Sequence, residues 1–137
     1  MTIDIKKLAQ KSLEARMYSY SPYSHFRVGA VLVCKDGSIY TGANIENAAY
    51  SPTNCAERTA FFLAIMDGKR DFSAIFISGG ADTEPIDFCP PCGVCRQLMR
   101  EFCNPDEFDI FLVKSQNDIK SYKLGELLPL SFGPDNL

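Results

Sequence analysis

Three cysteines stand where two helices are predicted to begin. Cys55 opens a predicted helix over residues 55–66, and Cys92 and Cys95 open another over 92–102 in the C-x-x-C spacing that lets one turn offer two thiolates to one metal ion. A helix start presents free backbone N–H groups and the positive end of the helix dipole, which lower a thiol's pKa and favour the metal-binding thiolate. Three protein ligands on a zinc ion leave a fourth position for water, as in catalytic zinc sites. A fold that brings the two helix starts together therefore predicts a catalytic metal site.

Taken alone, the same cysteines allow other interpretations. A C-x-x-C pair can be a redox site, although here it follows two prolines rather than a thioredoxin-like strand. Cys89 extends the spacing to the beginning of a ferredoxin-type iron–sulfur run, but Met99 stands where that run needs another cysteine. Cys89 could also join Cys55, Cys92 and Cys95 in a closed structural zinc site. The spacing favours a metal only slightly, and the choice depends on the residues around Cys55.

A disulfide framework is the remaining use of six cysteines, and it depends on the compartment. Residues 1–11 lack the apolar stretch and the cleavage site of a signal peptide, so we expect a cytoplasmic protein with reduced thiols. Cys34 and Cys103 are then most simply small buried hydrophobes. The longest apolar runs cover seven residues. A membrane-spanning helix needs about 20, so no membrane partner is expected.

Charge and length limit the remaining classes. Fourteen Lys and Arg against seventeen Asp and Glu give a net charge of −3, which provides no general attraction to phosphate backbones. A nucleic-acid partner is therefore not expected. The length of 137 residues suits a single domain, 1–137, that buries roughly two-thirds of the surface of the unfolded chain.

The apolar pattern predicts alternating helices and strands. An amphipathic helix over 3–18 precedes a strand over 26–34, whose nearly unbroken apolar run is typical of a strand covered on both faces. Asp36-Gly37 predicts a hairpin leading into a strand over 38–45. We expect the helix over 55–66, a strand over 74–78 closed by Gly79-Gly80, the helix over 92–102, a strand over 108–113 and a short helix over 124–128. This order predicts an α/β fold with a mixed sheet between helices.

Glu57 decides between the uses of the cysteines. It lies two residues after Cys55 at the same predicted helix start, close enough to move protons between a metal-bound water and a substrate. The C-x-E segment, followed by P-C-x-x-C at 91–95, matches the three-cysteine form of the zinc deaminase signature. The double motif is much more specific than either half.

The chain resembles the small zinc-dependent cytidine deaminases over nearly its whole length. Residues 23–30, YSHFRVGA, are similar to that family's Y-S-x-F-x-V-G-A, and residues 42–48, GANIENA, to its G-x-N-I-E-N-A. The segments CAER at 55–58 and PCGVCRQ at 91–97 follow in the family's order. The resemblance implies a three-layer α/β/α cytidine deaminase-like fold with a mixed five-stranded sheet, and a homotetramer of the three-cysteine type.

The resemblance also implies a reaction. Zinc held by Cys55, Cys92 and Cys95 would support the hydrolytic deamination of cytidine and deoxycytidine to uridine and deoxyuridine plus ammonia, a step of pyrimidine salvage. Zinc-bound hydroxide would attack C4 of the pyrimidine, and Glu57 would move a proton to N3 and then to the departing amine.

Further residues are implied to bind the substrate. Asn44 and Glu46 lie two apart on a predicted strand, so their side chains project to one face, and the family gives them hydrogen bonds to a sugar hydroxyl. Phe26 is implied to pack against the base, and the backbone of Ala56 and Cys92 to help hold the base and the hydroxide. Without the family, Asn44 and Glu46 suit a solvated strand end, and Phe26 suits the core.

Charge gives one more expectation. Zinc with three thiolates carries a formal −1, which makes its bound water less acidic, so a nearby cation is expected. Arg58 follows Cys55 by three residues and Arg96 follows Cys92 by four, so each lies on its cysteine's helix face. The resemblance favours Arg58, with Gln97, as donors to the cysteine sulfurs.

The resemblance assigns two positions to contacts between subunits. Tyr50 and Phe132 occupy positions that reach a neighbouring subunit's site in tetrameric relatives. His25, the single histidine, is expected to be a solvent-facing loop residue, because Cys55 fills the place that a histidine ligand takes in other members.

Two other functions stay open at this point. A blasticidin-S-type aminonucleoside deaminase shares the zinc motifs, although the N-I-E-N run at 44–47 favours the cytidine enzymes. A non-catalytic four-cysteine zinc module would require Cys89 as its fourth ligand.

Overall fold

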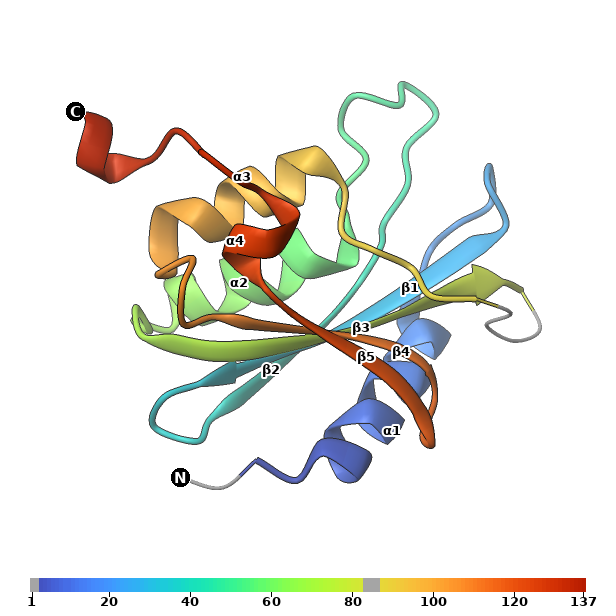
Figure 1. The fold of residues 1–137 in the computed structure, drawn as a ribbon. Helices are drawn as coiled ribbons and strands as arrows, with labels where there is room; N and C mark the ends of the chain where they lie inside the picture. The colour runs from blue at the N-terminus through green and yellow to red at the C-terminus, as the bar shows by residue number, and fades with distance from the viewer. Residues whose placement is uncertain (1–2, 83–86) are drawn as a thin grey trace.

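A computed structural model describes residues 3–82 and 87–137 (Figure 1). The helices are α1 (Ile5–Ala15), α2 (Ala56–Met66), α3 (Gly93–Phe102) and α4 (Leu124–Leu127). The strands are β1 (Phe26–Cys34), β2 (Ile39–Ala43), β3 (Phe72–Ala81), β4 (Asp109–Ser115) and β5 (Asp118–Lys123). Short 3-10 helices follow α1 at Arg16–Tyr18 and lie near the C-terminus at Pro134–Asn136.

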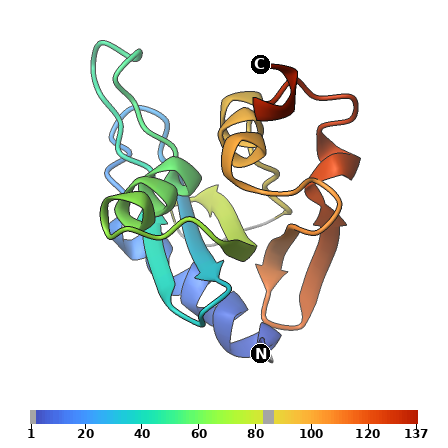
Figure 2. The same cartoon turned by 90° about the vertical axis from the view of Figure 1, so that its left-hand side faces the viewer.

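The strands form one five-stranded sheet in the order β2-β1-β3-β4-β5. β3 and β4 run parallel, and the other neighbouring pairs are antiparallel. Helix α1 covers one face, while α2, α3 and α4 lie over the other (Figures 1 and 2). This arrangement confirms the mixed sheet and the three layers that the resemblance implied.

The alternation of side chains in β1 supplies both cores. Ala30, Leu32 and Cys34 point to the cluster shared with α2 and α3, whereas Val31 and Val33 point to the cluster shared with α1. These residues are at most 2% exposed. Because successive strand residues face opposite sides, an unbroken apolar run fills both layers, as the sequence predicted.

A glycine in β2 sets where α2 begins. A Cβ at Gly42 would lie 2.3 Å from the carbonyl oxygen of Ala56 and 2.6 Å from the nitrogen of Ala60. The first turn of α2 therefore rests directly on the backbone of β2, which a side chain would prevent. This close contact holds the start of α2, and with it Cys55 and Glu57, against the sheet.

Two predicted boundaries are wrong. β3 does not end at Gly79-Gly80, since both glycines continue the antiparallel pairing with β1 as far as Ala81. The strand predicted to reach residue 45 ends at Ala43, and Ile45 forms isolated bridges with Tyr20 and Asn54 instead.

The apolar pattern also missed one strand, β5. Its apolar residues Ile119 and Tyr122 pack on the clusters of opposite faces, so neither face shows an alternating apolar pattern.

Candidate metal centre and active site

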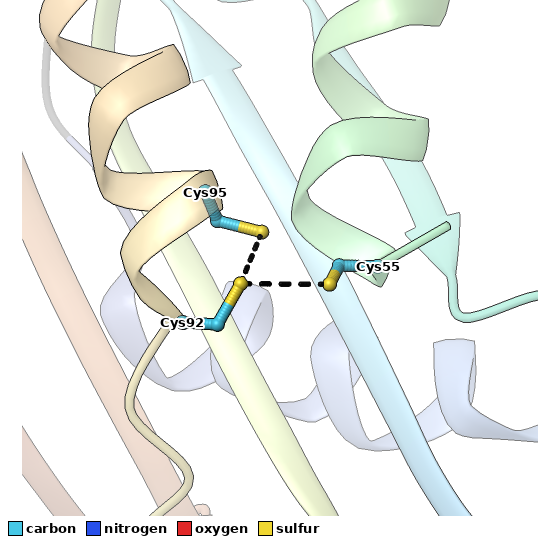
Figure 3. Close-up of side chains that lie close together, drawn as sticks. All are labelled: Cys55, Cys92 and Cys95. Atoms are coloured by element: carbon cyan, nitrogen blue, oxygen red, sulfur yellow. Dashed lines mark hydrogen bonds between the residues drawn. The ribbon is translucent and has the colours of Figure 1, made fainter. Parts of the chain in front are cut away.

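Cys55, Cys92 and Cys95 converge where α2 and α3 begin (Figure 3). Cys55 and Cys92 are the extended N-cap residues of the two helices, and Cys95 lies in the first turn of α3. The Sγ atom of Cys92 lies 3.7 Å from that of Cys55 and 3.5 Å from that of Cys95. All three sulfurs lie within 4.8 Å of one another, and residues 3–82 and 87–137 contain no other such group of three His, Cys, Asp or Glu ligands.

Local sequence places Cys92 at a helix start. Pro90 and Pro91 keep the residues before them out of the α conformation, so the chain approaches Cys92 extended, and α3 begins at Gly93. Pro91 is itself fully buried and anchors this approach. Together with the contact between α2 and Gly42, this brings two helix N-termini to one spot.

The Cys55 sulfur favours the thiolate, the form that binds a metal ion. The pKa of Cys55 is lowered to about 5, first because the Cys95 thiol donates a hydrogen bond to it. The guanidinium of Arg58, with Nη2 3.4 Å from Cys55 Sγ, acts in the same direction. Three sulfur ligands at helix N-termini suit zinc and leave one tetrahedral position open, so the residues present fit a catalytic zinc ion.

Glu57 lies beside this cluster in the first turn of α2 and is only 4% exposed. Burial raises its pKa to about 7, and the negative charge of Cys55 adds to the shift, whereas a hydrogen bond with Cys95 opposes it. A carboxyl group with a pKa near neutrality both accepts and donates a proton readily. Ala56, fully buried, is the first residue of α2, and its N–H is one of the free donors of a helix start.

The Asn44 side chain is buried and hydrogen-bonds to neighbouring backbone groups, so it is not a solvated strand end. Its Oδ1 accepts hydrogen bonds from the Val28 N–H at 2.9 Å and the Ser19 hydroxyl at 2.5 Å, and its Nδ2 donates to the Phe26 carbonyl at 2.8 Å. The side chain is 9% exposed. It therefore fixes the start of β1, including the backbone of Phe26.

Glu46 is held as a carboxylate. Its Oε1 accepts from the N–H groups of Tyr23 and Ser24 at 3.0 and 3.1 Å, and its Oε2 accepts from the Ser24 hydroxyl. These hydrogen bonds, that of the Ser24 hydroxyl first, lower its pKa. A pocket of about 380 Å³ adjoins the carboxylate, lined by Tyr23, Ser24, Glu46, Asn47, Tyr50 and Thr53.

Comparison with known proteins gives the family. Residues 2–108 match the family described as the cytidine and deoxycytidylate deaminase zinc-binding region. The chain belongs to the cytidine deaminase family. It is 48% identical over 136 residues to a cytidine deaminase of Sporosarcina psychrophila, covering 98% of this chain and 96% of the relative. A cytidine deaminase of Halalkalibacterium halodurans is 47% identical and covers 98% of both chains.

Solved structures agree with the fold. The crystal structure of a cytidine deaminase from Burkholderia pseudomallei superposes with a TM-score of 0.85 at 42% identity, covering 96% of this chain and 100% of that one. A cytidine deaminase from Mycobacterium tuberculosis gives 0.81 at 32% identity, covering 96% and 99%. The cytidine deaminase-like fold, the family and the zinc-binding character predicted from the motifs are confirmed.

Arg58 and Gln97, which were both expected to donate hydrogen bonds to the cysteine sulfurs, make different contacts. Arg58 contacts Cys55 Sγ through Nη2, which also lies 3.4 Å from the Thr53 carbonyl, in line with its predicted role. Gln97 instead donates from Nε2 to the Phe132 carbonyl at 2.9 Å. This contact joins α3 to the C-terminal segment, and a role of Gln97 toward a sulfur stays a prediction.

The remaining cysteines and the histidine lie outside the cluster. Cys34 and Cys103 are buried, as predicted, and burial raises both pKa values. Cys89 lies over Gly79, where a Cβ would meet its sulfur at 2.7 Å, and burial raises its pKa to about 12. His25 is a solvent-facing loop residue, with its side chain 68% exposed and 3.5 Å from Asp82.

The other candidate residues are exposed at the surface. Phe26 is 42% exposed, so it is not plain core, while Tyr50 and Phe132 are 73% and 58% exposed. Motif analysis missed Ser19 and Ser24, which hold the Asn44 and Glu46 side chains. The serine in YSHFRVGA was a signal for Ser24, whereas Ser19 lies outside every motif.

No helix in the described part of the chain is long and apolar enough to cross a bilayer.

Proposed function

We propose that this protein removes the 4-amino group of free cytidine and deoxycytidine by hydrolysis, releasing uridine or deoxyuridine and ammonia. The observation that carries the proposal is the convergence of three cysteine sulfurs with the buried Glu57 at two helix starts. A zinc ion bound by Cys55, Cys92 and Cys95 supplies Lewis acidity that lowers the pKa of water.

Glu57 is the proton carrier in this proposal. Its raised pKa suits a group that takes a proton from water, gives it to N3 of the base, and passes the second proton to the leaving amine. The C4–O bond forms first, and the bond from C4 to the exocyclic amino nitrogen then breaks. One proton of the water ends on N3 of uridine and the other on ammonia, so the step balances without another reactant.

The substrate is a free nucleoside in this proposal. The fixed carboxylate of Glu46 beside an open pocket suits hydrogen bonding to a sugar hydroxyl, and exposed Phe26 offers a ring face to the base. The N–H of Ala56 is a donor for the base at the start of α2. In the N-I-E-N run at 44–47, Asn44 holds the backbone of Phe26 and Glu46 lines the pocket, which favours cytidine over an aminonucleoside antibiotic.

We also propose a homotetramer, in which Tyr50 and Phe132 reach a neighbouring subunit. Large apolar side chains are exposed on α2 and on the segment after α1, where Phe62, Leu63, Met66, Met17 and Tyr18 are 44% to 87% exposed. Exposed large apolar side chains are the kind of surface that subunit interfaces cover. The six free thiols suit the cytoplasm. The single sheet that joins the five strands of the described residues suits action as one domain, 1–137.

The test compares the wild type with Glu57→Gln in a cytidine deamination assay with measured zinc content. We expect zinc in both proteins and activity lower by about 10² to 10⁴ in the variant, the usual scale of general acid–base catalysis. Glu101→Gln, at an exposed glutamate near the end of α3, is the control and should match the wild type. Full activity in Glu57→Gln would reject the mechanism, and a wild type without zinc would reject the metal site.

A further inference from the structure

Arg96 spans two backbone carbonyls next to the metal centre. From the second turn of α3, its Nε donates to the Pro91 carbonyl at 2.8 Å and its Nη1 donates to the Leu127 carbonyl at 2.7 Å. Neither partner is a carboxylate or a sulfur, and the side chain is partly buried. A guanidinium offers several donors in a rigid plane, so one side chain can fix two carbonyls at once.

The Pro91 carbonyl belongs to the same planar peptide group as the Cys92 N–H. Holding that carbonyl fixes the plane of the group and points the Cys92 N–H away from Arg96, because the peptide bond is trans. The plane also contains the N and Cα atoms of Cys92, whose backbone then turns into α3 with φ −68° and ψ 167°. The direction of the Cys92 side chain therefore depends on the contact between Arg96 and Pro91.

The three cysteines differ in the protein contacts that fix their side chains. Cys95 is fully buried among core residues, and Cys55 is half-buried and receives a hydrogen bond from Arg58. Cys92 is exposed, so packing does little to fix its side chain. Of the three, Cys92 depends most on a backbone held in place from outside.

The other end of the contact is firmly anchored. Leu127 ends α4, whose first residue Leu124 is fully buried and donates its N–H to the Phe108 carbonyl at 3.0 Å. The Gly125 N–H donates to the Pro105 carbonyl at 2.9 Å. Arg96 thus ties the approach to Cys92 to a segment that is attached to the start of β4.

We propose that Arg96 is a positioning residue for the metal ligand Cys92, which it orients through the Pro91 carbonyl while it is braced by the Leu127 carbonyl. The inference rests on the zinc site of the proposed function. It differs from the expectation that an arginine near Cys92 compensates charge on the sulfur, because Arg96 contacts carbonyl oxygens.

The test measures how fast the purified holoenzyme gives up zinc to an excess of a colorimetric chelator. Arg96→Met keeps much of the side-chain volume and removes every donor. We expect its zinc release to be about 10 to 100 times faster than in the wild type, the usual effect of losing a group that orients a ligand. In the cobalt-substituted protein, the sulfur-to-metal charge-transfer absorption should weaken or shift as the Cys92 thiolate is misoriented.

Arg100→Met is the matched control. Arg100 lies one turn further along α3 and binds Ser131 Oγ at 2.9 Å and Asp135 Oδ2 at 3.2 Å, so it also ties α3 to the C-terminal segment but does not reach Pro91. Its zinc release and cobalt spectrum should match those of the wild type even where its melting temperature falls. Equally fast release from both methionine variants would show a general stability effect and overturn the proposal.

Wild-type zinc release in Arg96→Met also overturns it. If that variant does not fold, Arg96→Lys provides the test, since one ammonium cannot reproduce the paired contacts of the guanidinium, and release faster than wild type is again expected. A wild type that holds no zinc would instead refute the proposed function, so the two failures are distinguishable.

Discussion

The contact between Gly42 and α2 predicts that one methyl group damages both stability and catalysis. In Gly42→Ala the new Cβ would lie 2.3 Å from the Ala56 carbonyl oxygen, whereas Cβ contacts under 3.0 Å are essentially never found. The start of α2 must therefore move by about 0.7 Å or more from β2. Overpacking of this kind costs about 1 to 3 kcal/mol, which corresponds to a melting temperature lower by roughly 3 to 12 °C for a chain of this size.

The same movement displaces Cys55 and Glu57, which stand at the start of α2. A displacement near 1 Å of a catalytic group can cost about 10² in rate, so we expect kcat/KM for cytidine to fall by about 10 to 100 times. Thermal unfolding followed by circular dichroism and a spectrophotometric deamination assay measure the two effects on one preparation.

Gly93→Ala is the control for the stability measurement. Gly93 is the first residue of α3, between two ligand cysteines, and a Cβ there meets nothing within 4 Å. Alanine in a helix is favoured over glycine by about 1 kcal/mol, so its melting temperature should be unchanged or slightly higher. A melting temperature and kcat/KM of Gly42→Ala equal to the wild-type values would refute the argument from close packing.

Three further variants test the site. Arg58→Ala should lower kcat about 10 to 100 times with an unchanged fold, because Cys55 loses its guanidinium partner, and wild-type turnover together with wild-type zinc content would contradict this. Cys89→Ser should keep its zinc in metal analysis, since Cys89 lies outside the sulfur cluster, whereas loss of the metal would favour a four-cysteine module. Asn44→Ala should lower the free energy of unfolding by about 1 to 3 kcal/mol in urea titration, because the Val28 N–H and the Phe26 carbonyl lose their hydrogen-bond partners. The same variant should raise KM. An unchanged free energy of unfolding would contradict the role of Asn44 in holding the start of β1.

The chemistry was predictable from the sequence because it is local. Cys55 and Glu57 share one helix start, and Cys92 and Cys95 share another, so the sequence shows each half of the site, whereas the meeting of the two halves depends on the fold. The burial of both faces of β1 was likewise predicted by its continuous apolar run. These features depend on short-range geometry, which a sequence carries directly.

Other features depend on contacts between distant segments. β5 is an edge strand stabilised by pairing with β4, and its own residues alternate poorly, so only the partner strand reveals it. Gly79 and Gly80 are typical of a turn, yet pairing with β1 keeps them in a strand. Gln97 and Arg96 find backbone carbonyls in the C-terminal segment, which no spacing within their own helix indicates.

The hydrogen bonds of Asn44 have a consequence for how this protein can evolve. If the Asn44 amide contacts the sugar as well as joining β2 to β1, a substitution of Asn44 that changes which sugar is bound also removes hydrogen bonds between these two strands. Selection for stability then shields this position from change. Adaptation to a new nucleoside is channelled instead to the exposed segment that contributes Asn47 and Tyr50 to the pocket, where side chains can vary without loss of strand pairing.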